Sequence, residues 1–396
     1  MLIQALAAAA LLAASAHAQT PCSGRLDSPV STVPLPSAPF GVVVSSDGCS
    51  VFASLMNAGG GKLSGVAVLH RTGGKLDLVR TVPTPEPLTG IVLTHDGKLL
   101  IAAALTRIIF LDVACLVSGC SKPIAGSFST GDKMQSIYVN VTADDKLLFV
   151  SEESAAAITV IDLARARKNG YRADSIVGKI PVGRAPIALT FSPDGRWLYT
   201  TSQSAVPAWG WPAACKPENQ QRGSNLVNPE GAVVVIDVAR AKSDPENAVS
   251  GRIKAGCSPV RMAISPSGDR IYVTARNNNA VVAFDASKLI SDPAGARLGM
   301  APVGAAPVPI ALVNNGKLLV VGNSNRFAGG GSAESLTVLD TAKIGASGGA
   351  TVGTLPAGEF PRELRLSPDG QTLYLANFGS HSLQAMDVAS LPGAQR

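Results

Sequence analysis

Residues 262–285 read MAISPSGDRIYVTARNNNAVVAFD. A short apolar run at 262–264 leads into a turn at 266–268, and the run YVT at 272–274 follows the turn. A third run at 281–285 is rich in valine and ends in aspartate. Glycine suits tight turns because it adopts positive φ, and aromatic and β-branched residues are typical of strands. This stretch therefore predicts three short antiparallel strands in succession.

The same arrangement occurs seven times along the chain. The turns are Ser46-Asp47-Gly48, His95-Asp96-Gly97, Ala143-Asp144-Asp145, Pro193-Asp194-Gly195, Pro266-Ser267-Gly268, Asn314-Asn315-Gly316 and Pro368-Asp369-Gly370. Successive turns lie 48 to 54 residues apart, except for one interval of 73 that contains an insertion at about 204–230. A fourth apolar run completes most units. Four short strands in each unit of about 50 residues describe one blade of a β-propeller.

The two ends of the repeat predict how the ring closes. The last copy stops soon after Asp387 without a fourth run, whereas a spare run at 28–36 precedes the first copy. We expect this N-terminal strand to complete blade seven, which removes exposed sheet edges. The predicted fold class is all-β: a seven-bladed β-propeller with four antiparallel strands per blade. It forms one domain, 19–396, and the insertion lies on the top face, where second strands connect to third strands.

Several of these runs resemble a known family. The Tyr-Val-Thr-Ala of 272–275, the Tyr-Leu-Ala-Asn of 374–377 and the SPDG turns are similar to YVTN-type β-propeller repeats. That group resembles the seven-bladed lactonase-like propellers, which include 6-phosphogluconolactonase and relatives of carboxymuconate cyclase. The resemblance implies the propeller fold for nearly the whole mature chain, and it gives lactonase activity as an alternative function. Glu363 stands where lactonase-like chains often have a histidine after Pro-Arg.

The N-terminus predicts export. An apolar run at 5–14 precedes Ala16-His17-Ala18, which fits the small-x-small rule for signal-peptide cleavage. We expect cleavage of residues 1–18 and a secreted or periplasmic protein. The run is shorter than the roughly 20 residues that a membrane-spanning helix needs. We therefore expect no transmembrane anchor, and we expect a monomer.

Six cysteines fall in the predicted mature chain. An even number in an oxidising compartment favours disulfides over metal binding. Six cysteines allow fifteen connectivities. Placing each cysteine on the top or bottom face of the blades favours the pairs Cys22–Cys49, Cys115–Cys120 and Cys215–Cys257.

Composition and motifs narrow the function classes. The chain carries 34 Lys and Arg against 28 Asp and Glu, a net charge of +6. No concentrated basic, aromatic-interleaved patch is present, so we expect no nucleic-acid partner. The sequence contains no P-loop, GxSxG, HExxH or dinucleotide-binding pattern in a matching context. We therefore predict no metal site and no cofactor.

The innermost strand of each blade borders the central channel. Its outward-facing positions are apolar in all seven copies: Val42, Ile91, Val139, Leu189, Met262, Ile310 and Leu364. The opposite positions are small or polar, and they include Tyr138, Arg261 and Glu363, with Asn140 and Arg365 two residues further along two of these strands. Arginine and glutamate are seldom buried unless paired. Either these charges pair across the channel, or the arginines bind the carboxylate or phosphate of a ligand.

Further candidates lie toward the top face. They are Arg362, Arg276, Glu152, Glu153, Gln203, Asn323, Asn377, Trp209, Trp211 and His381. The polar members are either ligand-binding groups or ordinary solvated loop residues. The two tryptophans of the insertion are either a lid or partner contact over the channel mouth, or they pack on their own blade.

These observations leave two functions open. The first is an exported binding module without chemistry of its own, whose partner is a small anionic ligand or an envelope protein. The alternative is a lactonase-like enzyme, a hydrolase or a cycloisomerase acting on a carboxylated substrate. In that case Arg261 and Arg365 stabilise the substrate carboxylate and oxyanion, and Glu363 or Glu152 moves the proton.

Overall fold

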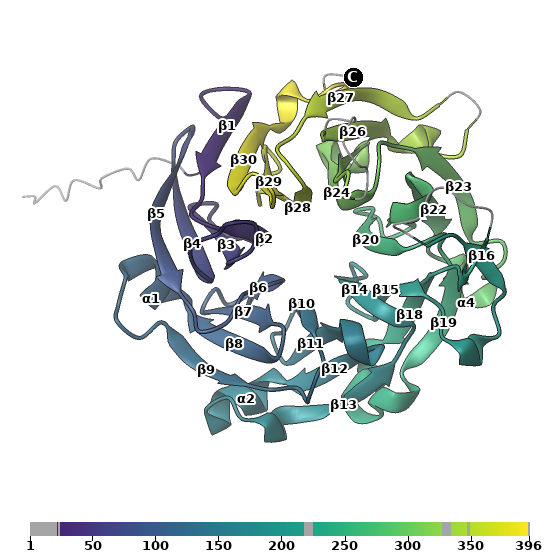
Figure 1. Ribbon diagram of the computed structural model, residues 1–396, viewed down its shortest axis with the longest axis horizontal. Helices are drawn as coiled ribbons and strands as arrows, with labels where there is room; N and C mark the ends of the chain where they lie inside the picture. The colour runs from purple at the N-terminus through teal and green to yellow at the C-terminus, as the bar shows by residue number, and fades with distance from the viewer. Residues whose placement is uncertain (1–21, 23, 218–224, 327–333, 347–348, 395–396) are drawn as a thin grey trace, which may run out of the picture.

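The computed structural model describes residues 22, 24–217, 225–326, 334–346 and 349–394. Seven four-stranded antiparallel sheets stand around a central axis as the blades of a ring (Figure 1). Strands dominate, and the few helices are short. The predicted all-β, seven-bladed β-propeller is confirmed.

Each blade runs from its inner strand at the channel to its outer strand at the rim. Blades one and two contain β2 (Ala38–Val44), β3 (Ser50–Met56), β4 (Gly65–Thr72), β5 (Lys75–Pro83), β6 (Ile91–Leu93), β7 (Leu99–Ala104), β8 (Arg107–Asp112) and β9 (Ile124–Phe128). Blades three and four contain β10 (Ser136–Val141), β11 (Leu147–Glu152), β12 (Ala157–Asp162), β13 (Ile176–Pro181), β14 (Arg184–Phe191), β15 (Trp197–Ser204), β18 (Ala232–Asp237) and β19 (Val249–Lys254). Blades five and six contain β20 (Pro259–Ile264), β21 (Arg270–Ala275), β22 (Ala280–Asp285), β23 (Arg297–Pro302), β24 (Pro307–Val313), β25 (Leu318–Asn323), β26 (Ser335–Asp340) and β27 (Thr351–Pro356). Blade seven contains β28 (Pro361–Leu366), β29 (Thr372–Asn377), β30 (Ser382–Asp387) and β1 (Val30–Pro34).

The N-terminal strand closes the ring as the sequence predicts. β1 pairs antiparallel with β30, so that Val30 lies opposite Met386. Buried Arg71 strengthens the junction, because its Nη1 donates a hydrogen bond to Thr372 Oγ1 of blade seven at 2.8 Å. The Nε of Arg25 lies 2.9 Å from Asp387 Oδ2. The first and last strands of the described chain thus belong to one blade.

The aspartate that ends most third strands starts the next element. Asp112, Asp162 and Asp237 each accept a hydrogen bond from the backbone N–H three residues later. This caps the short helices α1 (Val113–Ser118), α2 (Leu163–Asn169) and α3 (Val238–Ser243). A further short helix, α4 (Lys288–Ser291), occupies the same place in blade five. The helices lie on the connection to the outer strand, away from the channel.

The core lies between neighbouring blades. The apolar positions predicted on the inner strands are all buried: Val42, Ile91, Val139, Leu189, Met262, Ile310 and Leu364. Behind them, Phe52, Phe110, Phe149 and Phe284 are fully buried on second and third strands. Because the blades pack face to face, few charged residues remain in the interior.

The three disulfides that the loop positions favour are present. They are Cys22–Cys49, Cys115–Cys120 and Cys215–Cys257. No helix in the described ranges is long and apolar enough to span a membrane. The predicted signal peptide, 1–18, lies outside the described residues.

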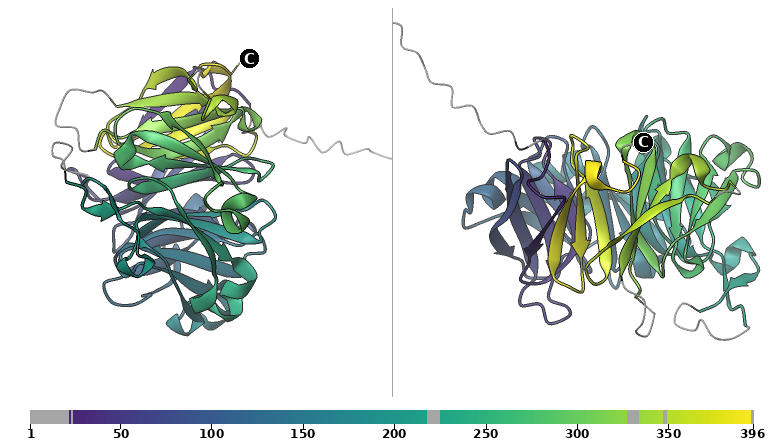
Figure 2. Two further views of the ribbon diagram at one scale, coloured as in Figure 1. Left: turned by 90° about the vertical axis from the view of Figure 1, so that its right-hand side faces the viewer. Right: turned by 90° about the horizontal axis from the view of Figure 1, so that it is seen from above.

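The insertion of blade four leaves the ring at its periphery. Between β15 and β18 the chain forms the short strands β16 (Ala213–Cys215) and β17 (Asn228–Pro229), which pair with each other. They lie at the outer edge of the ring near blade five (Figure 1) and project beyond the blade ends in the edge-on view (Figure 2). The disulfide between Cys215 and Cys257 ties the insertion to the loop before blade five.

Candidate functional site

The central channel contains two cavities, one above the other. The lower chamber has a volume of about 420 Å³ and includes His95 and Pro368 of the bottom turns in its lining. The upper chamber has a volume of about 240 Å³ and opens toward the top face. Its lining consists of Tyr138, Glu153, Ile187, Gln203, Val260, Arg261, Arg276, Arg326 and Arg362. Tyr138 and Arg261 line both chambers, so they mark the boundary between them.

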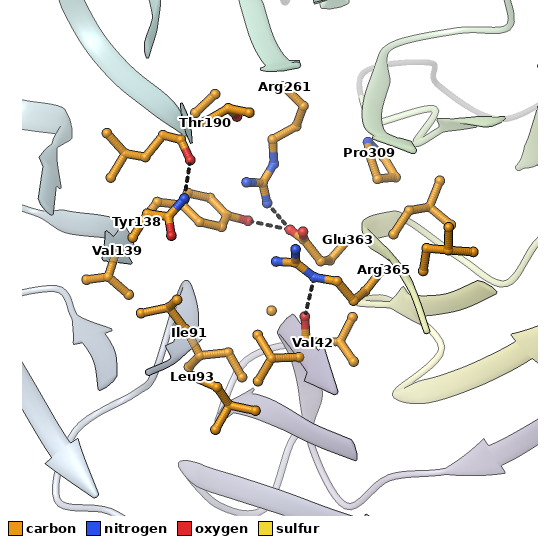
Figure 3. Close-up of a pocket in the computed structure, with 18 of the residues that line it drawn as sticks. Val42, Ile91, Leu93, Tyr138, Val139, Thr190, Arg261, Pro309, Glu363 and Arg365 are labelled. Atoms are coloured by element: carbon orange, nitrogen blue, oxygen red, sulfur yellow. Dashed lines mark hydrogen bonds and ion pairs between the residues drawn. The ribbon is translucent and has the colours of Figure 1, made fainter. Parts of the chain in front are cut away.

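Three side chains from three blades meet at this boundary (Figure 3). Arg261 of β20 forms an ion pair with Glu363 of β28, through its Nη2 and the Oε2 of the glutamate. The hydroxyl of Tyr138, from β10, donates a hydrogen bond to the same oxygen at 3.1 Å. The Arg261 guanidinium carbon lies 3.5 Å from the centre of the Tyr138 ring, within cation–π range. The Arg261 and Glu363 side chains are only 12% and 13% exposed.

Small residues on the other inner strands make room for this bridge. The equivalent positions hold Gly41, Gly90, Ala188 and Pro309. A Cβ atom at Gly90 would lie 2.4 Å from Cδ1 of Tyr138, so any other residue there would collide with the ring. The sequence thus places three large polar side chains at the axis and keeps the facing positions small.

Hydroxyl groups on the second strands hold the inner strands in place. The ladder between β20 and β21 is irregular between Pro259 and Met262, which leaves the N–H of Arg261 without a ladder partner. That N–H donates to Thr274 Oγ1 at 3.1 Å, and the threonine hydroxyl donates to the carbonyl of Val308 in the next blade at 3.1 Å. In the same way, the backbone N–H of Tyr138 donates a hydrogen bond to Ser151 Oγ at 3.0 Å.

These hydroxyl groups are not among the site residues expected from the sequence. Their signal is the serine or threonine that recurs near the end of the second strand in several copies: Ser54, Ser151, Thr201 and Thr274. Each accepts a hydrogen bond from the inner strand of its own blade. The threonine of the YVT run therefore positions the channel residue of its blade.

Burial and mutual repulsion shape the electrostatics of the channel. Burial lowers the pKa of Arg261 to about 10, while Glu363 acts in the opposite direction. Burial also lowers the pKa of Arg362 to about 9, and the nearby charges of Arg326 and Arg276 lower it further. Both guanidinium groups stay positive at neutral pH. An additional negative charge beside them would stabilise their charged form.

Arg362 lies on an aromatic platform at the top of the channel. Its guanidinium carbon is 4.0 Å from the centre of the Phe40 ring and 5.6 Å from that of Phe360. Its Nε is buried and has no hydrogen-bond partner within the described part of the chain. Across the chamber, Arg276 Nη2 donates to Gln203 Oε1 at 2.6 Å. The predicted residues Arg261, Arg276 and Arg362 are thus brought to one chamber.

Arg326 of the upper chamber was not among the site candidates, whereas Glu153 and Gln203 were among those of the top face. Glu153 and Gln203 follow or end second strands, and Gln203 Nε2 donates to Glu153 Oε1 at 3.4 Å. Arg326 lies in the loop after β25 and corresponds to no repeated position. Its arrival beside Arg362 depends on the path of that loop, which carries no sequence signal.

The lower chamber has a different character. Aliphatic residues of the inner strands make up much of its lining, together with the polar residues His95, Asn140, Thr190 and Arg365. Asn140 uses its Nδ2 to donate to the carbonyl of Leu189 at 2.9 Å. Arg365 donates from Nε to the carbonyl of Val42 at 3.3 Å (Figure 3). The predicted residues Asn140 and Arg365 therefore face this chamber, on the opposite side of the bridge from Arg362.

Glu152 lies inside blade three and lines neither chamber. Its carboxyl group accepts hydrogen bonds from Ser136 Oγ at 2.9 Å and from Thr159 Oγ1 at 3.0 Å. Burial raises its pKa, and the surrounding hydroxyl groups offset only part of that shift. Asparagine occupies the equivalent position in blades six and seven, at Asn323 and Asn377. The position therefore suits a neutral hydrogen-bonding group.

The remaining top-face candidates lie away from the channel. Trp209 and Trp211 contact each other, with ring centres 5.2 Å apart. They also contact Arg252 and Lys254 on the outer strand of their own blade. This is the arrangement in which the insertion packs on blade four. His381 lies at the turn before β30, and neither chamber includes it in its lining.

Fold and site together define a seven-bladed β-propeller with an arginine-rich chamber in its channel. In the described ranges, no group of three or more His, Cys, Asp and Glu residues has the arrangement of a metal site. No protein-family model matches the chain, and no curated protein sequence matches it.

Solved structures resemble the chain over almost its full length. One is the Kuenenia stuttgartiensis hydrazine synthase, with a TM-score of 0.65 and 20% identity over 90% of this chain and 97% of that chain. Another comes from a crystal structure of the mitotic checkpoint complex, with a TM-score of 0.63 and 14% identity over 97% and 99% of the two chains. At these identities the likeness shows the fold alone.

Proposed function

We propose that this chain is an exported binding module that takes a small anionic ligand into its central channel. The observation that carries the proposal is the gathering of Arg261, Arg276, Arg326 and Arg362 around one cavity of about 240 Å³. Ligand sites in proteins are concave and contain a few convergent polar groups. An envelope protein that inserts an acidic group into the same opening is the other partner we consider.

Export is supported by two independent features. The first is the predicted signal peptide at 1–18, and the second is the set of three disulfides, which are typical of oxidising compartments. We infer a secreted or periplasmic location for the mature chain. N-terminal sequencing of the protein from its natural source tests this, and a mature start at Gln19 is the expected result.

The contacts of Glu363 favour binding over chemistry. Its Oε2 already accepts hydrogen bonds from Arg261 and Tyr138. The ion pair across the channel thus explains these charged residues without a reaction.

Matched arginine substitutions test the proposed function. Arg362→Gln removes a charge from the upper chamber and Arg365→Gln one from the lower, whereas Arg252→Gln removes a charge from the outer rim. A thermal-shift screen of small anions on the mature protein identifies a ligand, and calorimetry then measures its affinity for each variant. We expect at least one channel variant to lose affinity and the rim variant to keep it. Equal affinity in all three variants contradicts the proposal.

Lactone hydrolysis is the second candidate, because Glu363, Arg261 and Tyr138 converge beside a cavity. In that account the arginine holds a carboxylate or oxyanion and the glutamate moves the proton. A hydrolysis screen with sugar lactones and other lactones tests it, with Glu363→Gln as the variant. Turnover that falls at least tenfold in the variant supports the enzyme, and turnover that stays unchanged removes it.

A further inference from the structure

The lower chamber contains one cationic side chain that no carboxylate pairs with among the described residues. At the upper end of the chamber, Arg261 and Glu363 form an ion pair, so their charges cancel. At the lower end, His95 Nδ1 lies 2.9 Å from Asp145 Oδ1. The remaining charged residue of the lining is Arg365, which forms no ion pair in the described ranges. With the Arg261–Glu363 pair counted, the lining therefore has a net charge of one positive unit.

Arg365 is held in an orientation that a ligand can reach. Its Nε donates to the carbonyl of Val42 on β2 at 3.3 Å, so one edge of the guanidinium group is fixed to the neighbouring blade. Figure 3 shows this group directed into the channel beside Glu363. Its terminal nitrogens have no acceptor in the described part of the chain, and the residue is exposed. This leaves a guanidinium edge that can bind a carboxylate through two parallel hydrogen bonds.

The wall of the chamber offers contacts to an apolar group. Val44, Val92, Leu93 and Leu366 line the chamber and are partly exposed. Covering such side chains with a hydrocarbon removes apolar surface from water, which is favourable. The volume of about 420 Å³ falls within the roughly 300 to 1,000 Å³ that is typical of ligand pockets. The chamber therefore suits a ligand that has an apolar part as well as a charge.

A second negative charge is unfavourable in the same space. Glu363 also lines the chamber, and Arg261 is already paired with it. His95 is engaged by Asp145, so it does not offer a second cationic site. A second carboxylate on the ligand would therefore lie near Glu363 or against the aliphatic wall, where its charge would be desolvated without a partner.

From these features we infer that the lower chamber binds a small aliphatic monocarboxylate, with the carboxylate on Arg365 and the hydrocarbon chain along the aliphatic wall. The inference rests on the proposed function and adds the chamber, the charge and the apolar part of the ligand. The ligand enters from the bottom face, because the bridge of Tyr138, Arg261 and Glu363 lies between this chamber and the top face. Affinity should therefore increase with chain length and decrease when a second carboxylate is added.

Isothermal titration calorimetry tests this with four related probes. Hexanoate, butanoate, adipate and hexanamide are titrated into the mature protein at neutral pH and constant ionic strength, because salt screens charge interactions. Butanoate should bind about 4- to 15-fold more weakly than hexanoate, the range for the loss of two partly or fully buried methylene groups. Adipate has the length of hexanoate and a second carboxylate, so it should also bind more weakly. Neutral hexanamide should give no heat.

Variants at Arg365 identify the chamber. Arg365→Gln should weaken hexanoate binding by about 10- to 100-fold, the range for a lost hydrogen bond to a charged group. Arg365→Lys keeps the charge but lacks the planar fork, so it should keep only part of the affinity. It is also the variant to use if Arg365→Gln does not fold. Arg252→Gln, on the outer rim, is the control and should leave hexanoate binding unchanged.

Three results would overturn the inference. They are the absence of hexanoate binding, binding of adipate or hexanamide as tight as that of hexanoate, and hexanoate affinity that Arg365→Gln does not change. If anion binding is lost in Arg362→Gln but kept in Arg365→Gln, the ligand occupies the upper chamber. The proposed function then stands while the inference fails. If neither the thermal-shift screen nor the titrations find a bound anion, both fail.

Discussion

Arg261 and Glu363 illustrate how a propeller accommodates charge at its axis. Each is contributed by a different blade, and each has an exposed fraction near one eighth. Neither side chain would be tolerated there alone, because an unpaired charge in such a site loses hydration without compensation. The Tyr138 ring and hydroxyl complete the set by contacting both partners.

The pair should therefore be strongly coupled. Arg261→Leu and Glu363→Leu each leave one charge without its partner, and we expect each to lower the free energy of unfolding by about 3 kcal/mol. The double variant removes both charges and should cost clearly less than the sum. Urea unfolding of the four proteins completes this cycle. Additive effects would mean that the two side chains do not interact.

Glu152 gives a residue-scale prediction about pH. Its pKa is raised by burial, so the folded protein binds its proton more tightly than the unfolded chain does. Its contribution to stability is therefore greatest below the ordinary pKa of a glutamate and is lost as the pH rises through the raised folded value. Glu152→Gln stays neutral at every pH, so its stability relative to the wild type should increase with pH. Thermal unfolding at pH 4 and pH 8 measures this, and a difference that does not change with pH contradicts it.

At the scale of elements, hydrogen bonds between hydroxyl groups of the second strands and the backbone of the inner strands fix the channel. We call each such hydroxyl contact a bracket. Thr274 connects the backbone N–H of Arg261 to the carbonyl of Val308, so one hydroxyl joins two blades. Similar brackets at Ser54, Ser151 and Thr201 occur around the ring. The inner strands are thus positioned by side chains that never reach the channel.

Removing one hydroxyl tests the bracket. Thr274→Val keeps the shape of the side chain but leaves the N–H of Arg261 and the carbonyl of Val308 unpaired. We expect a loss of about 1–3 kcal/mol in the free energy of unfolding, the cost of unsatisfied buried polar groups. Thr200→Val is a matched control, because the Thr200 hydroxyl donates at 3.3 Å to the carbonyl of the adjacent Thr201 in its own strand. A loss that is equal in both variants would show that the bracket has no special role.

The repeat could be predicted from sequence because each copy repeats its own local signals. Glycine turns and strands ending in aspartate recur at a near-constant spacing, and the spare strand before Pro39 predicts the closure. Tyr138, Arg261 and Glu363 stand out in the sequence because they interrupt a set of small residues, but the sequence leaves open whether their charges pair or bind a ligand.

Other features could not be predicted from the sequence, because they depend on contacts between blades and on the paths of loops. Glu152 and Glu153 are neighbours at the end of one strand, but one lies inside the blade and the other lines the upper chamber. Successive side chains of a strand face opposite ways, and the sequence does not say which faces the channel. Arg326 reaches the chamber from the loop after β25. The insertion lies at the outer edge of the ring, where Trp209 contacts Arg252 and Trp211 contacts Lys254.

At the scale of the whole molecule, stability depends on closing the ring. β1 comes from the start of the described chain and completes the last blade, so the junction is made only when both ends of the propeller are folded. The Cys22–Cys49 disulfide fastens the segment before β1 to blade one, and Arg71 fastens it to blade seven. A propeller that opens at this point exposes the edge of β30.

The disulfides should therefore differ in what they contribute. In the chain-entropy account, the 27-residue separation of Cys22 and Cys49 predicts about 3.5 kcal/mol, and the five-residue separation of Cys115 and Cys120 predicts about 2 kcal/mol. We expect the double variant Cys22→Ala/Cys49→Ala to lose more stability and to exchange the amide hydrogens of β1 faster. Cys115→Ala/Cys120→Ala is the control. A larger loss in the control would place the weak point of the ring elsewhere.

The most direct test of the channel as a binding site is a crystal structure of the mature protein grown with a saturating concentration of the anion that the thermal-shift screen identifies. We predict electron density for one ligand in the central channel, with its negatively charged group within hydrogen-bond distance of an arginine that lines the upper or the lower chamber. A channel without ligand, or a ligand bound only on the outer surface of the ring, would contradict the account.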